Sequence, residues 1–325
     1  MGRSYTFYRM QIEILGTESL GVRGLSCLVE VKDRKIVIDP GLALGYNRHG
    51  LLPHPLQVSV GESVRQKILM ALEDATDVVF SHFHGDHVPL VDANPYQMPA
   101  QTVAAVCQAR TQKPRFWAKG TRGISQNMSR RLRSLRIALD NELLNAEGQS
   151  DGQLSFSIPV PHGQRGEHLG MVMMTRIEEG DEVFVHASDI QLLDEATVSR
   201  ITSWQPTIVL ASGPPLYLPH ISRKQRAMAW QNAVRLAHNV DTLILDHHLI
   251  RSKAGCLWLD NVSATTEHRV CCAADFMVRH RTPLEAWRQR LYAEMPVPEG
   301  WHEAYARGAV DTGPYRDRIR RVEEW

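Results

Sequence analysis

The chain has 325 residues, 43% of them hydrophobic, which is enough to bury a sizeable core. Its formal net charge of +1 gives no global electrostatic case for binding nucleic acid or a membrane surface. No apolar run is long enough to span a bilayer, and the polar opening residues 1–6 do not resemble a basic and apolar leader, so we expect a cytoplasmic protein with no membrane partner.

The first third of the chain is expected to form strands joined by tight turns. Alternating or β-branched residues predict strands over 11–15, 27–31 and 35–39, and residues 32–34 suit a hairpin turn between the last two. An amphipathic helix is predicted over 62–75, because its apolar residues recur on one face. A short strand over 77–80 follows it.

Residues from about 90 to 150 interrupt this pattern. No acidic residue occurs in 93–139, yet nine basic residues do: Arg110, Lys113, Arg115, Lys119, Arg122, Arg130, Arg131, Arg133 and Arg136. Residues 129–144 are predicted to be helical. Because no linker rich in Pro, Gly or Ser sets this segment apart, we expect a basic, partly helical insertion within a single domain that spans 1–325.

The second half returns to a strand-rich pattern. Strands are predicted over 154–160, 171–177, 183–187, 207–210 and 242–245, and helices over 194–202 and 224–238. From about residue 264 the chain is expected to be mostly helical. Two strand-rich halves that each carry helices predict a sheet-on-sheet core with helices outside.

Histidine and aspartate gather directly after the strand predicted over 77–80, where residues 82–87 read His-Phe-His-Gly-Asp-His. His82 and His84 should project to the same side, because alternate residues of an extended chain do. Imidazole and carboxylate groups suit Zn²⁺, Fe²⁺ and Mn²⁺. Four such groups exceed what one tetrahedral ion with an open position needs, so two ions are predicted to share them. The alternative, that these are polar loop residues or hydrogen-bonded core histidines, is disfavoured by their number.

The pattern resembles that of the metallo-β-lactamase superfamily, whose members carry H-x-H-x-D-H after a strand. In that superfamily a His, an Asp and a His follow at later strand ends, and the matching positions here are His162, Asp189 and His247. An earlier Asp before Pro-Gly matches Asp39. The resemblance implies an α/β protein with the metallo-β-lactamase fold, a four-layer αββα sandwich.

The resemblance extends to an uncharacterised, mainly archaeal branch of that superfamily with no established substrate. Six short motifs spread along the chain carry it: 18–23, 38–41, 161–163, 187–189, 213–218 and 246–249. The likeness of this branch to the superfamily implies that its members are metal-dependent hydrolases. It says little about which reaction they catalyse.

The resemblance also implies a ligand set for two divalent ions, with zinc favoured and iron or manganese as alternatives. The first ion would be held by His82, His84 and His162, and the second by Asp86, His87 and His247, with Asp189 bridging the two. His248 remains an alternative to His247, because adjacent side chains at a strand end point in opposite directions. Its position relative to the strand favours His247.

Two ions about 3.5–4 Å apart would bind a water and lower its pKa, which gives a hydroxide nucleophile. Asp86 is expected to take up or return a proton, and Asp39 is expected to orient a metal ligand. Tyr217, Arg131 and Arg133 are candidate contacts for the substrate, because Tyr217 follows a strand and the two arginines belong to the basic segment.

The favoured function is hydrolysis of a small ester, lactone, thioester or amide. The basic segment supports an alternative, a phosphodiesterase or nuclease with an anionic substrate, although solvated surface explains the segment equally well. Residues 246–248 read Asp-His-His and not His-x-Ser-Gly-His, so nucleic acid is a less favoured partner. Iron-dependent redox chemistry and a non-catalytic binding role are weaker alternatives, the latter because the ligand set is complete.

Overall fold

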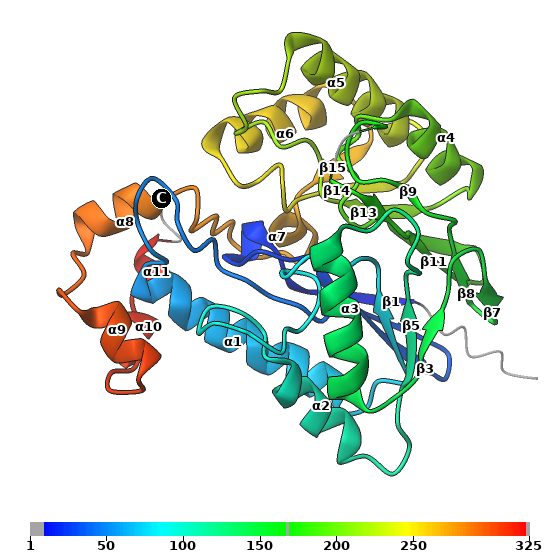
Figure 1. Cartoon of the computed structure of the whole chain (residues 1–325). Coiled ribbons are helices and arrows are strands. Elements are labelled where there is room, and N and C mark those ends of the chain that lie inside the picture. Colours follow the sequence, from blue (N-terminus) through cyan, green and yellow to red (C-terminus); the bar gives the residue numbers. More distant parts are fainter. Residues whose placement is uncertain (1–9, 167–168, 323–325) are drawn as a thin grey trace, which may run out of the picture.

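The structure is a computed structural model that describes residues 10–166 and 169–322, so the expectation for residues 1–6 lies outside the described residues. Two mixed sheets pack face to face, and helices cover the outer face of each (Figure 1). This arrangement confirms the predicted four-layer αββα sandwich of the α/β class. No helix in the described part of the chain has both the length and the apolar character needed to cross a membrane.

The first sheet is formed by the first half of the chain and has the strand order β1-β2-β3-β4-β5-β6. Its strands are β1 (Gln11–Gly16), β2 (Ser26–Val31), β3 (Arg34–Ile38), β4 (Asp77–Phe80), β5 (Arg115–Ala118) and β6 (Leu143–Asn145). The first three strands are antiparallel, whereas β3 to β6 run parallel to one another. Parallel strands end at the same edge of a sheet, which brings the loops after β3 and β4 together.

The second sheet has the order β15-β14-β13-β12-β11-β8-β7. Its strands are β7 (Ser150–Asp151), β8 (Leu154–Phe156), β11 (Thr175–Glu179), β12 (Glu182–His186), β13 (Ile208–Ala211), β14 (Thr242–Leu245) and β15 (Arg269–Cys271). Strands β12 to β15 are parallel. A separate antiparallel pair joins β9 (Val160–Pro161) to β10 (Met171–Val172).

Helices shield the outer faces of both sheets. Those on the first sheet are α1 (Pro55–Leu72), α2 (Ala100–Gln108) and α3 (Gln126–Leu139), and those on the second are α4 (Glu195–Ser203), α5 (Arg223–Ala237) and α6 (Lys253–Thr265). A short 3-10 helix, η1 (Glu18–Leu20), follows β1. After β15, the described part of the chain forms five short helices: α7 (Ala273–Phe276), α8 (Arg288–Glu294), α9 (Trp301–Ala306), α10 (Gly313–Arg316) and α11 (Ile319–Val322).

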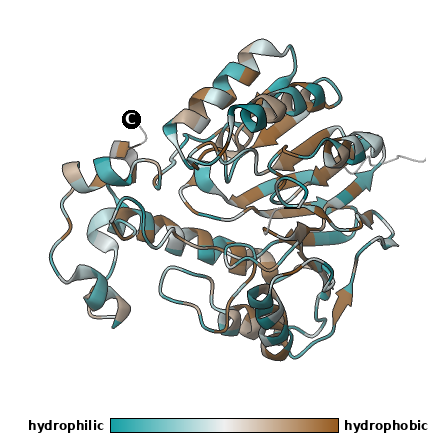
Figure 2. Ribbon diagram, turned by 45° about the horizontal axis from the view of Figure 1, so that its top comes forward, coloured by the Kyte–Doolittle hydropathy of each residue, from teal (hydrophilic) through white to brown (hydrophobic). Residues whose placement is uncertain are grey.

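Successive side chains of a strand point to opposite faces of the sheet, and this alternation divides the core into two apolar clusters. On β3, Ile36 and Ile38 face the second sheet, whereas Val37 packs under the helices of the first. On β4, Val79 faces inward between the sheets and Phe80 faces the helices. Figure 2 shows hydrophobic residues concentrated on the strands and hydrophilic residues on the outer helices.

Several element boundaries differ from the sequence-based expectation. Helix α1 begins at Pro55 and not at residue 62, because the buried ring of His54 caps it by accepting from the N–H of Leu56. The segment 90–150 contributes β5 and β6 to the first sheet as well as two helices, so it is more than a helical addition. The predicted strands 154–160 and 171–177 are each divided between two short strands, and α6 and β15 were not predicted.

Candidate metal centre

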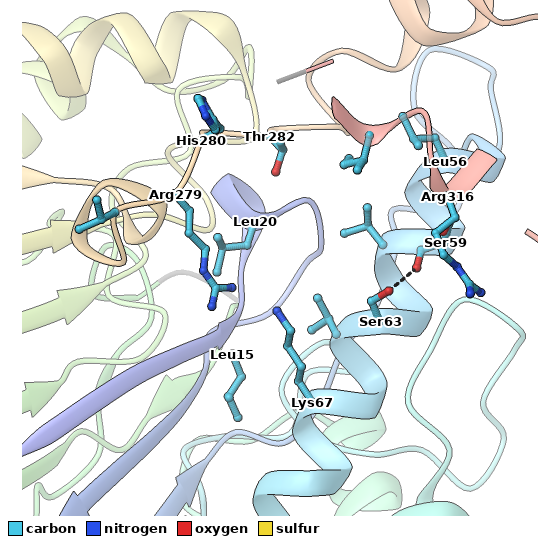
Figure 3. A pocket seen from close by; sticks show the side chains of 14 residues that line it. Leu15, Leu20, Leu56, Ser59, Ser63, Lys67, Arg279, His280, Thr282 and Arg316 are labelled. Carbon is cyan, nitrogen blue, oxygen red and sulfur yellow. Dashed lines mark hydrogen bonds between the residues drawn. The ribbon is translucent and has the colours of Figure 1, made fainter. Parts of the chain in front are cut away.

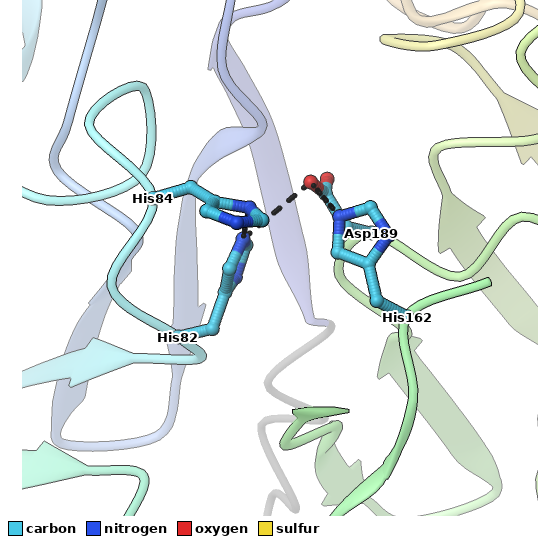
Figure 4. Close-up of side chains that lie close together, drawn as sticks. All are labelled: His82, His84, His162 and Asp189. Atoms are coloured by element: carbon cyan, nitrogen blue, oxygen red, sulfur yellow. Dashed lines mark hydrogen bonds and ion pairs between the residues drawn. The ribbon is translucent and has the colours of Figure 1, made fainter. Parts of the chain in front are cut away.

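Five loops that each follow a strand bring the predicted ligands together. Asp39 follows β3, residues 81–87 follow β4, His162 follows β9, Asp189 follows β12, and residues 246–248 follow β14. These side chains converge between the two sheets, as Figure 4 shows for His82, His84, His162 and Asp189. The convergence depends on pairing between distant strands, and therefore on the whole fold.

The first group of possible metal ligands consists of His82, His84, His162 and Asp189. One ligand atom from each lies within 4.8 Å of the others. Nε2 of His162 is 2.9 Å from Oδ2 of Asp189, and Nε2 of His82 is 3.5 Å from the same oxygen. The rings of His82 and His84 present nitrogens to each other at 2.9 Å.

The second group consists of Asp86, His87 and His247, and it uses the other oxygen of Asp189. Nε2 of His87 lies 3.1 Å from Oδ1 of Asp189, and Nε2 of His247 lies 3.7 Å from it. Nε2 of His247 is also 3.5 Å from Oδ2 of Asp86. One carboxylate therefore faces both groups, which is the position that the resemblance implied for a bridging ligand.

Several buried polar atoms of this cluster have no hydrogen-bond partner among the described residues. They are Nε2 of His87, Oδ1 of Asp189, and both ring nitrogens of His248. A buried polar atom without a partner is destabilising by roughly 1–3 kcal/mol, so a cluster of them requires an explanation. Divalent ions bound by Nε2 of His87 and Oδ1 of Asp189 would satisfy these two atoms, and the residues present thus fit a metal centre.

His248 lies beside the first group by its contact with Asp189, and it also forms a possible ligand group with Asp189 and His247. Its Nε2 is 3.3 Å from Oδ2 of Asp189, the oxygen that faces His82 and His162. His247, whose ring approaches Oδ1, belongs to the second group. The ring of His248 is also partly exposed and lines the cavity described below, whereas the ring of His247 is fully buried.

Asp39 contacts the cluster through His87 and Ser81, and it also forms a possible ligand group with His82 and His87. Its Oδ2 accepts hydrogen bonds from Nδ1 of His87 at 2.8 Å and from Oγ of Ser81 at 2.5 Å, and its Oδ1 accepts from the N–H of Ser81. Asp39, Ser188 and His247 all have positive φ, at 49°, 56° and 37°. This conformation is unfavourable for residues other than glycine, and residues that adopt it tend to cluster at functional sites.

Burial keeps several of these rings neutral, which is the form that binds a metal. It lowers the pKa of His84 to about 2 and that of His248 to about 4. Burial also raises the pKa of Asp86, but the charges of His87 and His247 outweigh it and lower the pKa overall. For His87 itself, burial lowers the pKa, whereas Asp189 and Asp39 raise it well above its usual value.

A cavity of about 470 Å³ opens onto the cluster. The cluster contributes His84, Asp86, His162, Asp189 and His248 to its wall. The remaining wall is mostly apolar and includes Leu169, Pro215, Leu218, Ile221 and the predicted contact Tyr217. No lysine or arginine is among the described residues that line it.

Arg131 and Arg133, predicted to contact the substrate, do not reach this cavity. Nη1 of Arg131 donates to the carbonyl oxygen of Phe83 at 3.1 Å, so it supports the loop that carries His82 and His84. Arg133 is exposed on α3. An amphipathic helix buries its apolar residues, here Leu132 and Leu135, and turns the basic ones toward solvent.

Other basic residues of the segment are also engaged elsewhere. Arg115 pairs with Asp77 and Asp151, and the buried ammonium group of Lys119 lies 3.3 Å from Glu147. Among the described residues, none of the basic residues of this segment lines the cavity, so the segment forms no anion-binding wall there.

Sequence reasoning missed a buried ion pair behind the second group. Arg251 donates from Nε to Glu18 at 2.7 Å, and its Nη2 lies 3.2 Å from both ring nitrogens of His247. Glu18 lies in the motif 18–23, which offered a signal, but nothing in the sequence around Arg251 marked it. Pairing across more than two hundred residues is not visible in local patterns.

A second cavity of about 430 Å³ lies between α1 and residues 278–282 (Figure 3). Its wall is apolar at Leu15, Leu20 and Leu56 and carries Lys67 and Arg279. None of the predicted metal ligands lines it, so the chemistry of the cluster belongs to the first cavity.

Comparisons with known proteins agree with this architecture, although no family model matches the chain. The structure of the metallo-β-lactamase fold protein YhfI from Bacillus subtilis covers 80% of this chain and 94% of its own, with a TM-score of 0.51 and 11% identity. At this identity the likeness is one of fold alone, and it confirms the predicted metallo-β-lactamase fold.

Relatives in sequence are much closer. A UPF0282 protein of Methanosarcina mazei is 48% identical over 306 residues, which cover 94% of this chain and 99% of the relative. UPF0282 protein PF0593 of Pyrococcus furiosus is 32% identical over 304 residues, which cover 90% of this chain and 96% of the relative. The chain therefore belongs to the UPF0282 family, an archaeal branch with the metallo-β-lactamase fold.

Proposed function

We propose that this protein is a metal-dependent hydrolase that uses two divalent ions, with zinc favoured, to cleave a small ester, lactone, thioester or amide. The observation that carries the proposal is that the seven predicted metal ligands lie together beside a largely apolar cavity. When bound, two ions activate water at neutral pH and polarise the oxygen under attack.

The residues of the chain have separate tasks in this proposal. Asp189 presents one oxygen to each ligand group, and Asp39 orients His87 through Nδ1. Asp86 lines the cavity with a partly exposed carboxylate, so it is the acid best placed to accept a proton and return it to the leaving group. The lowered pKa keeps Asp86 ionised, which the assignment requires, but it also makes the carboxylate a weak base, so the proton would have to come from a water acidified by the bound ions.

The lining of the cavity favours a neutral substrate over a phosphodiester. Arginine and lysine are common phosphate-binding residues, and neither lines the cavity among the described residues, whereas His220 does. Leu169, Leu218 and Ile221 instead offer apolar contact for an acyl or alkyl group. The phosphodiesterase alternative thus loses the support that the basic segment gave it.

A split substrate screen tests the proposal. The protein is purified without chelators, saturated with zinc, manganese or iron(II), and assayed on 4-nitrophenyl acetate, γ-butyrolactone, an acetyl thioester and bis(4-nitrophenyl) phosphate. We expect metal-dependent hydrolysis of at least one carboxylic substrate, absent in Asp189→Ala. Turnover of the phosphodiester alone would replace the proposal with its rival, and turnover of none of them by the metal-saturated protein would contradict it.

A further inference from the structure

The hydroxyl proton of Tyr217 has no acceptor among the residues that the structure describes. Its side chain lines the metal cavity, and its hydroxyl oxygen lies 3.0 Å from Nη1 of Arg251. A guanidinium group donates hydrogen bonds and accepts none, so the tyrosine oxygen is the acceptor in this contact. The single hydroxyl proton therefore points elsewhere, and no described residue accepts it.

Arg251 is itself held in one position. Its side chain is almost fully buried, and its Nε donates to Glu18, a carboxylate that is 1% exposed. Nη2 of the same guanidinium lies 3.2 Å from the ring of His247. One rigid planar group thus touches both the tyrosine hydroxyl and a predicted metal ligand, which places that hydroxyl close to the ligand set.

The tyrosine ring is fixed as well. The guanidinium carbon of Arg48 lies 4.9 Å from the centroid of the Tyr217 ring, and that of Arg251 lies 5.5 Å from it. Arg48 also donates to the backbone carbonyl of Arg251, so the two cations are joined. A cation is attracted to the face of an aromatic ring, so both arginines favour this position of the ring. A donor that is already in position needs no reorganisation when charge develops near it.

We infer that Tyr217 donates a hydrogen bond from its hydroxyl to the carbonyl oxygen of the substrate, as that oxygen gains negative charge during attack by water. Arg251 is a positioning residue for this donor. The inference rests on the proposed hydrolase function and adds a protein group to it. The hydroxyl keeps its proton throughout, so no bond of the tyrosine forms or breaks.

The plain alternative is that Tyr217 only packs the loop formed by residues 213–218. Packing and donation differ in what Tyr217→Phe should change. Phenylalanine keeps the ring and its contacts with both arginines but removes the hydroxyl. A packing role predicts little change, whereas a donor to the developing charge predicts a fall in kcat with KM nearly constant.

The test compares Tyr217→Phe with the parent protein on 4-nitrophenyl acetate and benzyl acetate, both zinc-saturated and with metal content measured. We expect kcat to fall on the order of 100- to 1000-fold on both esters, as for removal of one donor to an oxyanion, with KM within about twofold and two ions retained. Tyr292→Phe is the matched control, because its hydroxyl bonds to Leu52 and His302 and is not in the cavity. It should behave as the parent.

Each outcome is decisive. An active parent with an unchanged Tyr217→Phe variant overturns the inference and leaves the proposed function standing. A loss confined to benzyl acetate, whose leaving group is poor, would place the donor at the leaving group and also overturn it. A zinc-saturated parent that hydrolyses neither these esters nor the screen's other carboxylic substrates contradicts the proposed function, and the inference then fails with it.

Discussion

Nδ1 of His87 lies 2.8 Å from Oδ2 of Asp39, and this contact determines which ring nitrogen faces the metal cluster. With a metal ion at Nε2 the ring would be neutral, and because a carboxylate only accepts hydrogen bonds, the remaining proton would reside on Nδ1. The lone pair of Nε2 is then directed toward Asp189, 3.1 Å away. A carboxylate behind a histidine is a common device for orienting a metal ligand and raising its basicity.

Asp39→Asn should weaken the binding of the ion at the second ligand group and leave the binding of the other ion unchanged. Asparagine tolerates the positive φ at this position, so the backbone is preserved while the negative charge behind His87 is lost. We expect affinity at the second ligand group to fall by roughly 10- to 100-fold, as measured by zinc titration against a chromophoric chelator. Asp33→Asn, on the exposed turn between β2 and β3, is the control. Two unchanged affinities in Asp39→Asn would contradict the role given to Asp39.

The neighbouring histidines after β14 should behave differently when each is changed to alanine. His247→Ala should lose one ion, because its ring approaches Oδ1 of Asp189 together with that of His87. His248→Ala should keep both ions and lose activity, since its ring lines the cavity near a completed first group. Elemental analysis of both variants decides the matter, and the assignment is reversed if His248→Ala alone loses an ion.

His54 should make folding stability depend on pH. Burial lowers its pKa from 6.5 to about 4 in the folded protein. Above pH 6.5 the ring is neutral in both the folded and the unfolded state, so the favourable contribution of His54 to the free energy of unfolding is fully present. As the pH falls from 6.5 toward 4 the unfolded chain binds a proton that the folded protein does not, and this contribution is lost. Linkage gives a loss of about 2 kcal/mol between pH 7 and pH 5.

His54→Asn measures this contribution, because asparagine also caps helices but does not titrate. Urea unfolding at pH 7 and pH 5 should show that the parent loses about 2 kcal/mol more than the variant over this interval. Equal losses in the two proteins would show that His54 is not the source.

Arg131 and Arg133 provide a matched pair on α3. Arg131→Gln removes a charged donor from the carbonyl of Phe83 and should lower the free energy of unfolding by about 1.5–3 kcal/mol. Arg133→Gln, which is exposed, should change neither stability nor KM for any substrate, charged or neutral. If Arg133→Gln raises KM for an anionic substrate at low salt, the basic segment does guide substrates and the lining of the cavity has been misjudged.

The elements that could be predicted are those encoded locally. β-Branched residues identified β3 and a short apolar run identified β4, and the spacing of His82 and His84 placed them together on one side. The start of α1 could not be predicted, because its cap depends on His54 being buried against Tyr292 and Tyr315 far along the chain. Short strands that begin with an arginine, such as β5 and β15, form because a neighbouring strand provides hydrogen-bonding partners. The strand propensity of the local sequence does not reveal such a partner.

The same division holds at the site. Asp39, His162 and Asp189 stood out through their motifs, whereas the contact between Glu18 and Arg251 joins residues whose relation exists only in the folded protein. Arg133 was misassigned because charge along a sequence does not tell which face of a helix meets the cavity. Burial decides that, and it depends on tertiary packing.

The most direct test of the account is the metal content of the protein purified without added metal or chelator, measured by elemental analysis beside Asp189→Ala. The account predicts close to two transition-metal ions per chain in the parent and fewer in the variant, with circular dichroism showing that both are folded. A parent that is folded yet metal-free, and that fails to take up zinc, manganese or iron on addition, would contradict it.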